Sequence, residues 1–354
     1  LAKQGDADAQ YRLGRLYQKG NGVSKNIEIA LSWYTLAADQ GHAVAQFAIG
    51  WIYDKGQEIT KNYNVALKWY TLSSDQGSMF AQYTLGRLYE YGRGVPKDFE
   101  KASKLYALAA GQGYSRAQSQ LGWMYENGKG VPKNYETAVK WYTLGAKQGY
   151  RSAQASLGWM YEFGSGISQS NEAAVKWYTL AAEQGLPFGQ YRLGLMYFHG
   201  KGVQKNSKTA ARWFDFASKQ RYALAQNFLG WMYEKGIGVP QNNETAVKWY
   251  TLAANQGEAE PQYYLGKMYR LGKGVHLNEK TAVKWFTLAA KQNYAKAQEQ
   301  LGWLYNNGKG VLQNNETAVK WYTLAAKQGL ALSQYNLGVM FNEGEGVKKS
   351  SEAA

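Results

Sequence analysis

Few residues of this sequence have the types and spacings that carry out chemistry. The three histidines, His42, His199 and His276, never approach one another along the chain at the spacing of metal ligands. There is no cysteine, which excludes disulfides, thiol nucleophiles and thiolate metal sites. No serine–histidine–aspartate arrangement and no H-E-x-x-H segment occurs. We therefore expect no catalytic residues, no metal site and no cofactor.

Glycine-rich turns such as Gly128-Lys129-Gly130 superficially resemble phosphate-binding loops. A dinucleotide fingerprint needs a strand before the glycines and a helix after them. Here the turn follows a helical pattern and returns in nearly every unit of the chain. These glycines are therefore interpreted as turn residues rather than as a nucleotide site.

Two positions four residues apart carry side chains suited to binding. In chain order they are Tyr11/Arg15, Phe47/Trp51, Tyr83/Arg87, Ser119/Trp123, Ala155/Trp159, Tyr191/Leu195, Asn227/Trp231, Tyr263/Lys267, Glu299/Trp303 and Tyr335/Val339. Wherever the later residue is Trp, the earlier one is small or polar, except Phe47. Helical side chains lean toward the N-terminus, so a later Trp covers the earlier site. Almost every unit thus places one large aromatic ring here.

Acidic residues run beside these rings, and two interpretations stay open. In the first, the rings pack across neighbouring units and stiffen the chain. In the second, they anchor an extended peptide or an amphipathic helix in a groove with an acidic margin. The acidic residues are Asp54, Glu90, Glu126, Glu162 and Glu234, with Phe198 and Arg270 breaking the series. The candidate partner-binding residues are Tyr11, Arg15, Trp51, Tyr83, Arg87, Trp123, Trp159, Tyr191, Trp231, Tyr263, Trp303, Tyr335, Glu126, Glu162 and Glu234.

A repeat of 36 residues must position all of these side chains. A Leu-Gly or Ile-Gly pair recurs from Gly14 to Gly338 with no insertion. Residues 6–329 form nine full repeats, 330–354 a truncated tenth, and 1–5 the end of a preceding helix. Self-similarity at this period is typical of solenoids.

Two amphipathic helices are predicted within each unit. In the fourth, Gly128 ends the first helix in a left-handed conformation, and Asn134 caps the second. Glycine is costly within a helix, so the recurrence of Gly122 and its equivalents predicts a very close approach of two helices. Trp141 and Tyr142 are predicted to pack between neighbouring units.

The string A-x-x-x-L-G-x-M-Y-x-x-G-x-G-V, followed by A-V-K-W-Y-T-L-A-A-x-Q-G, closely resembles the Sel1-like repeat (SLR) family, relatives of tetratricopeptide repeats. The resemblance covers essentially the whole chain. It implies an all-α, right-handed superhelical solenoid whose first helices line the concave side. It also implies a non-catalytic, bacterial adaptor, with a periplasmic or extracellular location slightly favoured over a cytoplasmic one. A cysteine-rich branch of the family is linked to β-lactams, but this chain lacks those cysteines.

The net charge of +15 raises the question of an anionic partner. The second helices carry a column of cations, five of which follow a glutamate by four residues, an order that favours solvated ion pairs. The column comprises Lys68, Lys104, Lys140, Lys176, Arg212, Lys248, Lys284 and Lys320. We therefore expect a protein or peptide partner rather than nucleic acid. No apolar run reaches the length of a membrane span.

Two further functions follow from the same features. Neither end of the sequence carries a polar capping unit, so the chain is expected to be part of a longer array or to join other copies end to end. A self-assembling fibre or sheet is therefore one alternative. The Trp and Tyr faces could also stack on sugars, which makes glycan binding in the bacterial envelope the other.

Overall fold

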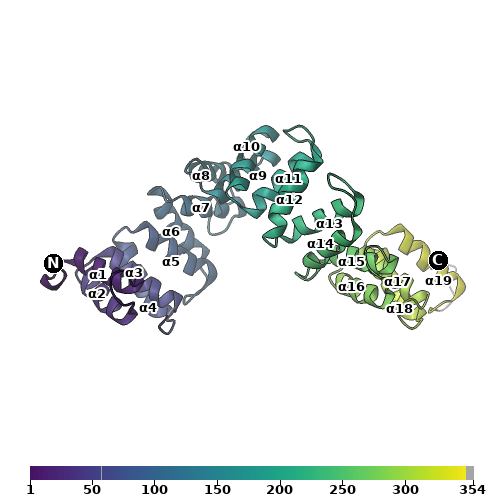
Figure 1. Ribbon diagram of the computed structural model, residues 1–354, viewed down its shortest axis with the longest axis horizontal. Helices are drawn as coiled ribbons and strands as arrows, with labels where there is room; N and C mark the ends of the chain where they lie inside the picture. The colour runs from purple at the N-terminus through teal and green to yellow at the C-terminus, as the bar shows by residue number, and fades with distance from the viewer. Residues whose placement is uncertain (57, 348–354) are drawn as a thin grey trace. The chain divides into compact units, whose positions relative to one another are not determined.

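The computed structural model describes residues 1–56 and 58–347 (Figure 1). Residues 348–354, which end the predicted tenth repeat, lie outside this range. Within the described residues all regular structure is helical and follows the 36-residue period. The all-α solenoid expected from the sequence is therefore confirmed.

Each repeat contributes a first helix and a second helix of 12 or 13 residues. A short 3₁₀ helix, Ala2–Gln4, precedes them. The first helices are α1 (Ala7–Lys19), α3 (Ala43–Lys55), α5 (Met79–Tyr91), α7 (Ser115–Asn127), α9 (Arg151–Phe163), α11 (Pro187–His199), α13 (Ala223–Lys235), α15 (Ala259–Leu271), α17 (Ala295–Asn306) and α19 (Ala331–Glu343). The second helices are α2 (Ile27–Asp39), α4 (Tyr63–Asp75), α6 (Phe99–Gly111), α8 (Tyr135–Lys147), α10 (Asn171–Glu183), α12 (Ser207–Lys219), α14 (Asn243–Ala254), α16 (Glu279–Lys291) and α18 (Asn315–Lys327).

The chain divides into two compact units, Leu1–Ala181 and Ala182–Ala354. In the first unit, α1 to α9 pack in chain order, each helix against the one before it. In the second, α11 to α19 do the same. Each unit is therefore a stack of helix pairs in which a repeat contacts its neighbours in sequence.

The helix ends follow the predicted cap residues. Asn134 accepts a hydrogen bond from the Thr137 backbone N–H at 2.8 Å and so starts α8. Gly128 has φ 63° and ends α7 in the left-handed region. Because the same residues return at the same positions in the other repeats, the turn geometry repeats with them.

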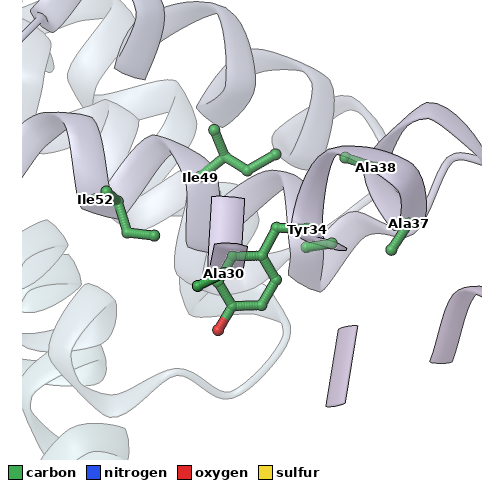
Figure 2. Close-up of a cluster of buried hydrophobic side chains, with 7 residues drawn as sticks. Ala30, Tyr34, Ala37, Ala38, Ile49 and Ile52 are labelled. Atoms are coloured by element: carbon green, nitrogen blue, oxygen red, sulfur yellow. The ribbon is translucent and has the colours of Figure 1, made fainter. Parts of the chain in front are cut away.

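One buried ring on each second helix forms the centre of the core. In the first repeat Tyr34 is only 1% exposed and packs in a cluster from α2 and α3 that Figure 2 shows, with Ala30, Ala37, Ala38, Ile49 and Ile52. In the fourth repeat a Cβ atom on Gly122 would lie 2.7 Å from Cδ1 of Tyr142. The close approach predicted at this glycine is confirmed, and its neighbour is the tyrosine ring. The tryptophan before the ring is half-buried against the core of the preceding repeat, as Trp69 is in this first cluster.

A ladder of glutamines joins neighbouring repeats, a feature that the sequence interpretation missed. Gln46, 4% exposed, donates to the carbonyl of Ala38 in the preceding repeat at 3.1 Å. Its own side-chain oxygen accepts from Gln76 at 2.6 Å. Satisfied polar groups inside a stack favour one register, since a displaced glutamine would lose its partners. The signal was present as a glutamine at the 36-residue spacing, preceded by alanine in seven of nine cases. The nine buried glutamines are Gln10, Gln46, Gln82, Gln118, Gln154, Gln190, Gln226, Gln262 and Gln298.

Candidate functional site

The paired positions lie on the first helices, four residues apart, as predicted. Two of the candidates, Arg15 and Arg87, are exposed, and Tyr335 on α19 is 69% exposed. The other ring-bearing candidates are half-buried, namely Tyr11, Trp51, Tyr83, Trp123, Trp159, Tyr191, Trp231, Tyr263 and Trp303. We call the surface that these residues form within each unit the first-helix face. Each half-buried ring packs with part of its surface and leaves the rest exposed.

The tyrosines of this face pack across repeat boundaries. The Tyr83 ring lies 5.5 Å from the ring of Tyr106 in its own repeat and 5.2 Å, edge-on, from Tyr114 of the next. Burial raises the pKa of Tyr83 to about 12. Tyr191 and Tyr263 make equivalent pairs of contacts. These contacts support the stiffening interpretation for the tyrosine members of the seam.

The tryptophans contact residues that interrupt the acidic series. Trp231 packs edge-on against Phe198 of the preceding repeat at 5.7 Å. The guanidinium of Arg270 lies 5.2 Å from the ring centre of Trp303. In these two places the residue that replaces the carboxylate therefore contacts the tryptophan of the next repeat.

The predicted acidic margin lies mostly inside the protein. Glu162 and Glu234 are 7% and 5% exposed. They accept hydrogen bonds from the core tyrosines Tyr178, at 2.8 Å, and Tyr250, at 2.9 Å. The same bond joins other members of the two columns, at Tyr106–Glu90 (2.5 Å) and Tyr142–Glu126 (2.6 Å). A buried hydroxyl needs an acceptor, and the carboxylate three residues after the tryptophan position supplies one. A role for Glu126, Glu162 and Glu234 in partner binding stays a prediction.

Glu234 shows how such a carboxylate keeps its charge. Burial alone would raise its pKa, but hydrogen bonds from Lys235 and Tyr250 and the nearby Lys267 outweigh burial and lower it. Lys235 Nζ lies 2.9 Å from Glu234 Oε1. Burial, and then the charge of Glu234, raise the pKa of Tyr250 far above its usual value. The pair therefore consists of an ionised carboxylate and a neutral phenol.

A cavity of about 420 Å³ lies between α1 and α3 in the first unit. Its walls are mostly apolar, and three of the predicted residues, Tyr11, Arg15 and Trp51, line it together with Phe47. Lys25 also lines it and is paired with Glu58. The remaining lining residues are Gln18, Lys19, Ile27, Tyr34, Val44, Ala48 and Ile52. We call it the apolar cavity.

A second cavity, of about 550 Å³, lies between α3 and α5. It shares Phe47 and Trp51 with the apolar cavity, so these two rings stand between the two. Four cationic side chains line it against a single carboxylate, Asp54; the cations are Lys55, Arg87, Arg93 and Arg116. The other lining residues are Tyr70, Phe80, Tyr83, Thr84, Leu88 and Tyr114. We call it the cationic cavity.

The cationic cavity lies where the tyrosine–glutamate pairing fails. Asp54 occupies the carboxylate position of the second repeat, one methylene shorter than the glutamates elsewhere. Burial, and then Asp54, raise the pKa of Tyr70 far above its usual value. Asp54 is therefore close to Tyr70, but among the residues that the structure describes no acceptor meets the distance and angles of a hydrogen bond with the fully buried Tyr70 hydroxyl. Both side chains line the cavity. The sequence shows an aspartate at a position that is glutamate in several other repeats. The consequence of this difference becomes visible only when the structure places the Tyr70 hydroxyl beside it.

The histidines and lysines have ordinary structural environments. His42 caps α3 by accepting from the Ala45 backbone N–H at 3.0 Å, and its ring stacks on Tyr11. Within residues 1–56 and 58–347, no three His, Cys, Asp or Glu side chains gather as a metal site would require. Of the five predicted glutamate–lysine pairs, Glu100–Lys104, at 2.7 Å, is the one that lies within 4.0 Å in this part of the chain.

The second helices also expose a column of apolar residues that the sequence interpretation passed over. Leu72 is 39% exposed and Leu108 is 56% exposed, each four residues after a cation of the basic column. The other exposed members are Leu36, Leu144, Leu180, Phe216, Leu252, Leu288 and Leu324. The Thr-Leu pair after each Trp-Tyr pair was the available signal. The outer face is therefore a mixed cationic and apolar surface.

Comparison with known proteins accounts for this architecture. A family model of the Sel1 repeat matches residues 7–42, 43–78, 80–114, 115–150, 151–186, 187–222, 223–258, 261–294, 295–330 and 331–354. The chain belongs to the Sel1 repeat family. Sel1 repeat proteins are generally non-enzymatic scaffolds for protein interactions.

Two solved structures of Sel1-type proteins are similar over most of this chain. The first is a protective antigen of uropathogenic Escherichia coli strains with an SLR fold, 34% identical, covering 99% of this chain and 75% of that chain at a TM-score of 0.85. The second is a Sel1 repeat protein from Oxalobacter formigenes, also 34% identical, covering 88% of this chain and 90% of that chain at a TM-score of 0.67. A comparison with curated proteins finds no match. Among the described helices of this Sel1 repeat chain, none has the length and apolar character to cross a membrane.

Proposed function

We propose that this Sel1 repeat chain is a protein-interaction scaffold that binds a partner on the first-helix face of its first unit. The observation that carries the proposal is the pair of adjoining cavities on α1, α3 and α5. Five of the predicted residues line them: Tyr11, Arg15, Trp51, Tyr83 and Arg87. Aromatic rings beside arginines are the composition of protein-binding hot spots, and concave sites of this size can accept partner side chains.

Rigidity favours binding at this face. Tyr83 and Phe47 are held against the buried rings Tyr106 and Tyr70, at 5.5 and 5.4 Å. A ring fixed before binding loses little conformational entropy when a partner contacts it. The packing role and the binding role are therefore compatible in the same side chains.

Site-specific photo-crosslinking tests the proposal. Val44 is exposed and lines the apolar cavity, so p-benzoylphenylalanine at this position should form adducts with a bound partner. The same probe at Lys140, exposed on α8, is the matched control. We expect adducts at position 44 that disappear when Arg15→Ala and Arg87→Ala are combined, both at exposed positions. Adducts of equal yield at positions 44 and 140, or adducts unaffected by the two substitutions, would refute this location of the binding face.

A further inference from the structure

The two cavities differ in chemistry although the repeats that build them are nearly identical in plan. The apolar cavity has one ion pair and two further cations around rings and aliphatic side chains. The cationic cavity sets four cations against one carboxylate. Among the described residues, Asp54 included, no carboxylate lies within 4.0 Å of Arg87, Arg93 or Arg116. Such a cavity attracts an anion.

Two of these arginines are held in place by an aromatic ring. The guanidinium groups of Arg87 and Arg93 lie 5.6 and 5.4 Å from the centre of the Tyr91 ring. This arrangement lowers the freedom of both side chains without neutralising them. The planar guanidinium can then donate two parallel hydrogen bonds to a carboxylate.

A buried donor also lies at this cavity. The Tyr70 hydroxyl is buried and unpartnered, while the equivalent hydroxyls of Tyr106 and Tyr250 donate to glutamates of their own repeats. A buried hydroxyl without a partner costs about 1–3 kcal/mol. The oxygen is covered in the unbound chain, so a ligand oxygen recovers this cost only where its binding uncovers the hydroxyl. At the position that is glutamate in several repeats, Asp54 is the only substitution that keeps a carboxylate but shortens the side chain.

We propose that the cationic cavity binds the side-chain carboxylate of an aspartate or glutamate in an extended partner peptide, while an apolar side chain of the same peptide fills the apolar cavity. This inference rests on the proposed function and adds the chemistry of the partner. The two cavities share Phe47 and Trp51, so a peptide that enters both crosses the width of one helix, α3. A helix with its side chains is about 10–12 Å wide and an extended chain advances about 3.3 Å per residue, so the two cavities suit side chains about three residues apart. Phe47 and Trp51 form the ridge that the peptide crosses.

A synthetic peptide array on the full chain tests this. Ten-residue peptides, N-acetylated and C-terminally amidated, carry one Phe, Leu or Trp and one Glu at spacings of one to six residues. Each has a matched peptide with Gln in place of Glu. We expect the tightest binding near a spacing of three, at least tenfold loss with Gln, and weakening by salt.

Four variants locate the carboxylate. Arg87→Gln and Arg116→Gln, both at exposed positions, should each weaken the Glu peptides about tenfold and leave the Gln peptides nearly unchanged. Tyr70→Phe keeps the ring and should weaken the Glu peptides several-fold. Asp54→Glu should do the same by giving Tyr70 an acceptor of its own. Lys140→Gln on α8 removes one charge far from the cavities in sequence and should change nothing, and circular dichroism checks that each variant is folded.

Three outcomes would overturn the inference. Equal binding of Glu and Gln peptides would show that the cationic cavity does not recognise a carboxylate, although the face would still bind peptides. Binding only of phosphoserine versions, or only of peptides with a free C-terminus, assigns the cavity to another anion. Absence of binding by any peptide of the array rejects the site, and the crosslinking experiment then decides separately whether the first-helix face binds a protein.

Discussion

The tyrosine–carboxylate column allows one substitution to be compared in two environments. Tyr106 and Tyr70 occupy equivalent positions and are both fully buried. Tyr106 donates to Glu90 at 2.5 Å, whereas Tyr70 has no hydrogen-bond partner among the described residues. Changing each to Phe removes only the hydroxyl. The two substitutions should therefore differ in their effect on the free energy of unfolding, and only Tyr106→Phe should lower it.

The expected changes in the free energy of unfolding follow from the hydrogen-bond partners of the two tyrosine hydroxyls. Tyr106→Phe removes a hydrogen bond to a buried charge, worth about 1.5–3 kcal/mol, and leaves Glu90 with the bond from Gln120 at 2.9 Å. We expect a loss of about 2 kcal/mol. Tyr70→Phe removes no bond and ends the burial of an unpartnered hydroxyl, so stability should be unchanged or higher by up to about 1 kcal/mol.

Urea denaturation followed by circular dichroism measures the two midpoints, and an unchanged m-value shows that the comparison is sound. Hydrogen exchange with mass spectrometry then assigns each change to its repeat, because a solenoid can unfold in parts. Equal losses of unfolding free energy for Tyr70→Phe and Tyr106→Phe would refute the reasoning, because the Tyr70 hydroxyl would then make a hydrogen bond of similar strength.

The remaining predictions concern the repeat itself. Gly122→Ala should cost about 1–3 kcal/mol, because its Cβ would meet Tyr142 at 2.7 Å, whereas Gly111→Ala on α6 has no neighbour within 4 Å and should gain about 0.5–1 kcal/mol; urea midpoints of the two variants decide. Asn134→Ala removes the cap of α8 and should cost about 1 kcal/mol, measured the same way, with no loss expected for Lys140→Ala at an exposed position of the same helix. Above about pH 10 the unfolded chain loses tyrosine protons that the folded chain keeps, so stability is full below that pH and falls as pH rises, by about 1.4 kcal/mol per pH unit for each buried tyrosine. Phenolate absorbance should therefore rise together with unfolding rather than before it, and the tyrosines concerned are Tyr34, Tyr70, Tyr106, Tyr142, Tyr250 and Tyr322.

Much of the fold was predictable because local rules repeat with the sequence. The left-handed glycine at Gly128, the cap at Asn134 and the close approach at Gly122 each depend on residues within one helix pair. The candidate rings were found by their four-residue spacing, which places them on one helix face whatever the tertiary structure. Which of them bind a partner stays a prediction, as does end-to-end association of the chain.

The sequence by itself determined the period, the helices and their ends, and which column of each helix is apolar, because these depend on backbone preferences and spacing along one or two helices. Only the tertiary structure decided what each polar side chain meets. Glu162 was expected on an open margin and instead accepts from Tyr178. Gln46 bonds to Ala38 of the preceding repeat and to Gln76 of its own, 8 and 30 residues away. The two cavities on α3 were likewise invisible in the pattern. Asp54 has one methylene fewer than glutamate, and the Tyr70 hydroxyl is left without a hydrogen-bond partner. Whether one methylene matters depends on the distance between the two side chains, which only the packing of α3 and α4 fixes.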